Sequence, residues 1–268
     1  MHTLSQLKGG IVKRLFVGTA DENYIAARWC AANGLYNDFY WLAVHCLEKY
    51  LKAVLLLNGR AVKIQAHKIT DLFSEVKNVA GKLVINQFIR PEPLKDQTWT
   101  GAPHDFICQL YDCGNPDSRY AIYPFYTVGN EVYKLDQMVF SIRRLVCQLD
   151  DLAKSKLEEN VKYYGDFGLP LDRVVNSEEL SDRRHAALNF NFPFAPANYA
   201  HTEFGNSSIA VNAVLDWGLI AQIESSDLSS AKIAVEAADW LLANVRIPKD
   251  VTGFICDAKQ AAQKLHSF

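Results

Sequence analysis

The sequence predicts an all-α protein, an antiparallel helical bundle with a helical C-terminal extension and little β structure. Two observations carry this prediction. Apolar residues recur at steps of three and four in most long segments, and residue types that begin or end helices flank these segments. The chain of 268 residues is 49% hydrophobic and 22% charged, as expected of a globular protein. A chain of this length can bury a core without a metal or a disulfide.

The first two predicted helices follow one another closely. Thr19-Ala20-Asp21-Glu22 has the pattern of a capping box, which predicts a helix over residues 21–33 that ends at Asn33-Gly34. A second helix is predicted to begin near Asn37 or Asp38 and to end at Asn58-Gly59. Its apolar positions are Tyr40, Ala43, Val44, Leu47, Tyr50, Leu51, Val54 and Leu55.

The next segments alternate between helix and loop. Thr70 and Asp71 can cap a third helix that runs to about Ala80, with Gly81 as its stop. Residues 83–89 fit a strand or a helix, and 90–103 read as a loop with three prolines. A short helix is expected at 106–111, and residues 120–128 form a possible short strand interrupted by a proline.

A long helix is predicted over residues 131–157. Its apolar seam consists of Val132, Leu135, Val139, Ile142, Val146 and Leu149. One interpretation is a core helix with a broad apolar face, and the other is a homodimer contact through residues 132–149. In such a dimer, Arg143 and Arg144 would line a shared groove.

The chain after residue 160 predicts a helical C-terminal extension. Residues 164–204 read as a long structured loop, and three further helices are predicted at about 208–223, 227–244 and 249–265. We therefore expect two parts. Residues 1–160 would form the bundle, with an insertion at about 81–130, and residues 161–268 would form a long loop and a helical extension packed on it.

The block LAVHCLEKYLKAVLLLNG, followed by HKITDLF, resembles the HEPN domain family. The resemblance lies mainly in residues 19–80 and 131–157. It rests on Leu47, Glu48, Lys49, Tyr50, Leu51, Lys52, Ala53, Gly59, His67 and Leu72. It implies a helical bundle, often dimeric, that is linked to nucleotide or RNA metabolism.

The resemblance also implies two alternatives for activity. Some family members are metal-independent RNases with an Arg and a His separated by four to six intervening residues, and others lack this motif and act as binding or scaffold domains. Arg60 and His67 have a spacing of six intervening residues, so that His67 could move a proton while Arg60 holds the phosphate. Alternatively, His67 begins the third helix and Arg60 is a solvated residue at a helix end.

A second cationic cluster occurs at Arg183, Arg184 and His185. Such a cluster can bind a phosphate, or it can be the solvated start of a short helix. The aromatic residues that follow can stack on bases or anchor the loop.

Metal and cofactor chemistry are not expected. His104, Cys108 and Cys113 form the only local set that suggests a metal, and their spacing lacks the close pairs of zinc sites. The usual phosphate-binding glycine motifs are absent, so no cofactor is predicted.

The charge balance and hydropathy limit the partners. With 28 Lys and Arg against 30 Asp and Glu, the chain has no global basic field, although local patches remain possible. No apolar run is long enough for a membrane span, and no signal peptide is recognised, which predicts a cytoplasmic protein.

The leading hypothesis is a binding or scaffold protein for RNA, a nucleotide or a protein partner. The alternatives are a metal-independent RNase and a structural dimerisation module.

Overall fold

The computed structural model describes residues 3–63, 68–90, 94–99, 101–114, 116, 118, 130–143, 145–146 and 217–266. These residues form helices and contain no strand, which confirms the predicted all-α class. The N-terminal helices are α1 (Leu4–Val12), η1 (Lys13–Gly18), α2 (Thr19–Ala32), α3 (Tyr36–Leu57), α4 (Ile69–Ala80) and η2 (Gly81–Leu83). The later helices are α5 (Pro103–Cys113), α6 (Glu131–Arg143), α10 (Trp217–Ile223), α11 (Leu228–Asn244) and α12 (Lys249–His266).

The first helix is longer than the sequence suggested. The chain is already helical at Gly18, so α1, η1 and α2 follow without a break, and η1 has the wider π-helical turn. The capping box predicted at Thr19 is wrong, because the Thr19 hydroxyl donates to the carbonyl oxygens of Leu15 at 2.9 Å and Phe16 at 3.3 Å. The capping box of this helix lies at its start, between Thr3 and Gln6.

The ends of α2 and α3 agree with the sequence. Gly34 and Gly59 both have φ of +73°, a conformation that glycine adopts without steric cost. After each glycine the chain turns back, so that the backbone N–H of Leu35 donates to the Cys30 carbonyl and that of Arg60 to the Leu55 carbonyl, both at 2.9 Å. These bonds satisfy carbonyl groups at the helix ends and stop both helices.

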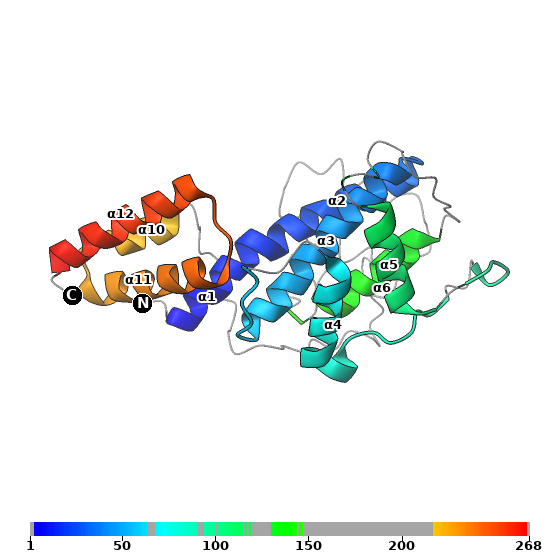
Figure 1. Cartoon of the computed structure of the whole chain (residues 1–268), viewed down its shortest axis with the longest axis horizontal. Coiled ribbons are helices and arrows are strands. Elements are labelled where there is room, and N and C mark those ends of the chain that lie inside the picture. Colours follow the sequence, from blue (N-terminus) through cyan, green and yellow to red (C-terminus); the bar gives the residue numbers. More distant parts are fainter. Residues whose placement is uncertain are drawn as a thin grey trace, which may run out of the picture.

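The bundle core lies between α2, α3, α4, α5 and α6 (Figure 1). α3 is its central helix, because it contacts each of the others, and most of its residues are buried. Tyr24, Tyr40 and Tyr50 are among the largest fully buried side chains. A core with this many phenolic hydroxyl groups requires polar partners inside it.

α6 packs its apolar face within the same chain. Leu135, Met138, Val139 and Ile142 are buried in the core, so the described part of the predicted seam packs within the same chain. The predicted helix over 131–157 is also too long. α6 ends at Arg143, where Leu145 and Val146 bond back by three residues to the Ile142 and Arg143 carbonyls. Residues 147–157 lie outside the described residues.

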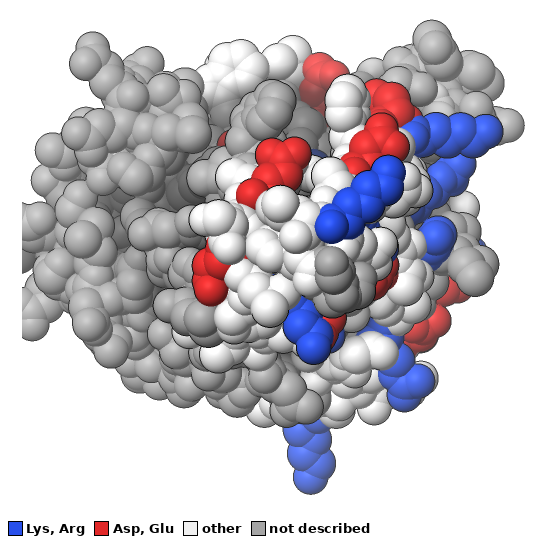
Figure 2. Space-filling view, turned by 90° about the vertical axis from the view of Figure 1, so that its left-hand side faces the viewer, with Lys and Arg blue, Asp and Glu red and all other residues white. Residues whose placement is uncertain are grey.

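The C-terminal helices α10, α11 and α12 pack together and reach the bundle through α1, against which α11 lies (Figure 1). α1 buries Gly9 and Gly10, and α11 buries Ala231, Ala234, Ala237 and Ala238. Seen from the end that these helices form, Lys and Arg side chains are interspersed with Asp and Glu (Figure 2). The helices at 227–244 and 249–265 were predicted closely, whereas the expected boundary at 160–161 lies outside the described residues.

Candidate functional site

Six polar side chains lie between α2, α3 and α6 and form a buried cluster, here called the polar seam. Its members are Asp21, Tyr24, Arg28, Tyr50, Asp136 and Arg143. Burial of an unpaired charge is costly. The partners of these side chains therefore indicate whether the cluster stabilises the fold or is free to bind a ligand.

One half of the polar seam centres on Asp21. Arg143 binds this carboxylate with two hydrogen bonds, from Nε to Oδ1 at 2.8 Å and from Nη2 to Oδ2 at 2.9 Å. The hydroxyl of Tyr50 donates to the same carboxylate from α3. The side chains of Arg143 and Asp21 are only 7% and 5% exposed, so this two-point ion pair is shielded from water.

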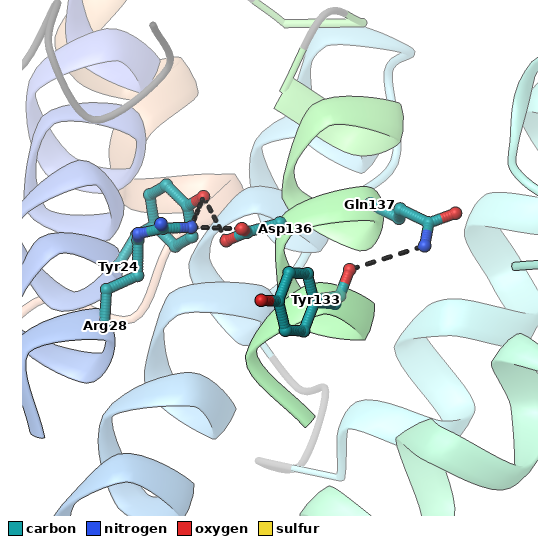
Figure 3. A network of polar contacts seen from close by, with 5 residues as sticks. All are labelled: Tyr24, Arg28, Tyr133, Asp136 and Gln137. Carbon is teal, nitrogen blue, oxygen red and sulfur yellow. Dashed lines mark hydrogen bonds and ion pairs between the residues drawn. The ribbon is translucent and has the colours of Figure 1, made fainter. Parts of the chain in front are cut away.

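The other half centres on Asp136. Tyr24 donates its hydroxyl to one oxygen of Asp136, and Arg28 forms an ion pair with the other (Figure 3). Arg28 also donates from Nη1 to the Tyr24 hydroxyl oxygen at 3.3 Å. The Arg28 side chain is 18% exposed, so this half lies closer to solvent than the first.

The two halves are related by a repeated spacing. Asp21 and Arg28 are seven residues apart on α2, and Asp136 and Arg143 are seven apart on α6. Seven residues span nearly two helical turns, so each pair lies on one helix face. Since each aspartate binds the arginine of the other helix, α2 and α6 run antiparallel in a fixed register. A slip by one turn would bury charges without partners.

Burial changes the protonation chemistry of this cluster. Burial and the nearby carboxylate raise the pKa of Tyr24 well above its ordinary value, and the same causes raise that of Tyr50. Burial also raises the pKa of Asp136, despite the opposing effect of Arg28. The phenols therefore remain hydrogen-bond donors at neutral pH, which suits a structural role.

The opposite side of α6 holds an extended segment. The Gln137 side chain accepts from the Ile89 backbone N–H and donates to the Ile89 carbonyl, both at 2.8 Å. Ser141 accepts from the Ile85 N–H at 2.8 Å. Figure 3 shows Gln137 pointing away from Asp136, so the two faces of α6 carry separate polar contacts. The alternative of a strand or a helix at 83–89 resolves to η2 followed by non-regular chain.

Arg60 is exposed in the loop that follows α3. Two residues further, the Val62 N–H donates to the Asn244 carbonyl at 2.9 Å, and Lys63 Nζ donates to the Leu242 carbonyl at 2.7 Å. The loop thus lies at the end of α11, which the sequence did not predict. The other predicted site residues lie outside the described residues, namely His67, Arg144, Arg183, Arg184 and His185.

Arg143 was expected to line a shared groove if the protein forms a dimer through this helix. In the structure it lies inside the bundle and binds Asp21. The sequence pattern placed Asp21 within a predicted capping box formed by Thr19 and Glu22, and it indicated no role for Tyr24, Arg28 or Asp136. The equal spacing of Asp and Arg on two helices was the available signal, but it does not by itself identify the partner helix.

The histidines that the structure describes near these elements have local contacts. His45 stacks edge-on against Trp41 at a centroid distance of 4.2 Å, and its Nδ1 lies 3.8 Å from Glu48. His104 Nε2 lies 3.7 Å from the Cys108 sulfur on α5. Within the described parts of the chain, no three His, Cys, Asp or Glu side chains are placed to hold a metal ion.

These contacts define a helical bundle with an internally neutralised polar seam and an exposed loop at its junction with the C-terminal helices. Residues 14–97 match the HEPN domain family, which confirms the resemblance for α2, α3 and α4. No curated protein and no solved structure matches the chain. None of the described helices is long and apolar enough to cross a membrane. A HEPN domain supports a nucleotide- or RNA-associated or an RNase-type family.

Proposed function

We propose that this protein is a HEPN-like binding or scaffold protein for RNA or a nucleotide, without strong catalysis, that acts in the cytoplasm. The HEPN match over residues 14–97 supports the ligand class. The pairing of Arg28 and Arg143 with buried carboxylates supports a structural and not a catalytic role for these two arginines, and this single observation carries the proposal.

A metal-independent RNase needs a cationic group that can reach a phosphate and a histidine that can transfer a proton. Arg143 is held on both sides of its guanidinium fork by Asp21, and Arg28 is engaged by Asp136 and Tyr24. Withdrawing either arginine would leave a buried carboxylate without its counter-ion, which costs several kcal/mol. The polar seam is therefore a structural element in this proposal.

The test is cleavage of a mixed panel of labelled RNAs in EDTA, followed by binding of the same RNAs and of free nucleotides. The wild-type protein is compared with His67→Ala and His185→Ala, and His104→Ala on α5 is the matched control. We expect binding without cleavage by every folded protein. Cleavage that is lost in His67→Ala or His185→Ala but kept in His104→Ala would contradict the proposal and establish the RNase alternative.

A further inference from the structure

Four cationic side chains lie at the junction between the bundle and the C-terminal helices, on the loop after α3 and on the segment that leads from α11 into α12. We call this surface the cationic joint. Arg60 and Lys63 belong to the loop after α3, Arg246 lies in the connection between α11 and α12, and Lys249 is the first residue of α12. All four residues are exposed.

Two hydrogen bonds hold the loop after α3 against the C-terminal end of α11, from which the second segment continues. The Val62 N–H donates to the Asn244 carbonyl at 2.9 Å, and Lys63 Nζ donates to the Leu242 carbonyl at 2.7 Å. Val62 and Val245 are buried, at 4% and 6% exposure, and anchor their loops beside exposed cations. The ends of α3 and α11 lie near one another in Figure 1, although Lys63 and Leu242 are 179 residues apart.

The two segments of the cationic joint carry only positive formal charges. Neither loop contains an acidic residue over 58–63 or 245–249, and the first carboxylate in sequence is Asp250 in the first turn of α12. The C-terminal carbonyls of α11 would oppose an anion, but two of them already accept from Val62 and Lys63. This surplus stands out in a chain whose formal net charge is −2.

An exposed aromatic residue lies close in sequence to two of these cations, Arg246 and Lys249. Phe254 is 72% exposed in the second turn of α12, five residues after Lys249. Exposed aromatic rings beside phosphate-binding cations are the elements with which proteins hold single-stranded nucleic acid. Arginine suits this role because its planar fork can bind two phosphate oxygens.

We propose that the cationic joint binds the phosphate backbone of single-stranded RNA, with Phe254 available to stack on a base. This inference rests on the proposed function and assigns it a surface outside the polar seam. A short patch of four cations suits a few successive phosphates rather than a long duplex. Binding should therefore depend strongly on salt and weakly on sequence.

The test measures fluorescence anisotropy of a labelled single-stranded RNA with the full chain. Arg60→Glu/Arg246→Glu reverses two cations of the joint. The control Lys82→Glu/Lys232→Glu reverses two exposed cations elsewhere and changes the net charge equally. We expect the joint variant to raise Kd at least about tenfold and to reduce the salt slope by about 1.4, since each phosphate contact contributes about 0.7. The control should stay within about twofold of wild type.

Phe254→Ala distinguishes base stacking from general electrostatic attraction of a polyanion in the binding measurement. It should weaken RNA binding about fivefold and leave binding of inorganic polyphosphate unchanged. Equal weakening by the joint and control variants would overturn the inference, because binding would then follow total charge. Unchanged RNA binding by the joint variant would also overturn it while leaving the proposed function intact.

Two further outcomes identify other failures. If the wild-type protein binds neither RNA nor a nucleotide, the proposed function fails together with this inference. If the joint variant loses binding to phosphatidylserine vesicles but keeps wild-type RNA affinity, the surface takes a lipid headgroup and the RNA assignment is wrong. Far-UV circular dichroism and the urea midpoint of each variant establish that the compared proteins are folded.

Discussion

The polar seam and the cationic joint both contain two arginines, but these arginines lie in opposite environments. In the polar seam, Arg28 and Arg143 are each bound by an aspartate and by the packing of the bundle. In the cationic joint, Arg60 and Arg246 are exposed on loops without acidic residues. An arginine thus acts as a structural element where its charge is neutralised by the fold, and as a binding element where its charge faces water.

The largest expected effect on stability comes from breaking an ion pair of the polar seam. Arg143→Met leaves the Asp21 carboxylate buried with Tyr50 as its remaining described side-chain donor, so unfolding free energy should fall by about 3–5 kcal/mol. Urea unfolding at constant m-value measures this loss. Arg60→Met is the exposed control and should change stability by less than about 0.5 kcal/mol.

A second variant sharpens the interpretation of that loss. Asp21→Asn/Arg143→Met should be more stable than Arg143→Met alone, because it leaves no ionised group of the pair buried. If Arg143→Met itself costs less than the exposed control, the ion pair does not hold α2 against α6 and the comparison fails.

The next effect concerns the neutral polar contacts of α6. Gln137→Ala removes both side-chain bonds to the Ile89 backbone, one of which satisfies its N–H. We expect a loss of about 1–3 kcal/mol in urea unfolding and faster hydrogen exchange at Ile89. Ser74→Ala, at an exposed position of α4, is a control. Unchanged exchange at Ile89 would show that Gln137 does not hold the segment.

A pH dependence distinguishes the buried phenols from solvated ones. Because burial raises the pKa of Tyr24 in the native state, the unfolded chain loses its phenolic proton first as pH rises through about 10. The native state then binds more protons than the unfolded state, so stability falls with rising pH. Tyr24→Phe should make this alkaline loss shallower by about 1.4 kcal/mol per pH unit.

The measurement is urea unfolding between pH 9 and 11, and Tyr50→Phe should behave in the same way for the same reason. Tyr36→Phe, at a half-buried position outside the polar seam, is the matched control. Parallel pH profiles for Tyr24→Phe and wild type would mean that the phenol titrates equally in both states, which contradicts its burial beside Asp136.

The smallest expected effect on stability comes from changing the exposed arginines of the cationic joint. Arg60→Glu/Arg246→Glu should shift unfolding free energy by less than about 0.5 kcal/mol, since both side chains are exposed. Thermal and urea unfolding measure this change. A loss of several kcal/mol would show that these arginines hold the two loops together, and would make the cationic joint structural.

Sequence patterns located most of the helices but only part of the site. The steps of three and four in α3 and the glycines after α2 and α3 act over a few residues, so their structural outcome was predicted correctly. Thr19 shows the limit of such local reasoning. A hydroxyl followed by Glu22 satisfies the capping pattern, but the preceding turn is helical and offers carbonyl groups that Thr19 binds instead.

The candidate site depended on contacts over much longer distances in the chain. Asp21 and Arg143 are 122 residues apart, and Arg28 and Asp136 are 108 apart. Nothing in the spacing of one helix specifies which other helix it meets. Arg143, expected on a groove if the chain dimerises, therefore lies in the core, whereas Arg60, for which a catalytic and a solvated role were both open, is exposed after a helix end.

The sequence alone determined the all-α class, the HEPN resemblance and the ends of α2 and α3, because helical periodicity and glycine conformation are local properties. Only the tertiary structure decided which arginines are neutralised and which remain exposed. That outcome depends on the distance between charges and on their burial, which exist only once α2, α6, α11 and the loop after α3 have packed together.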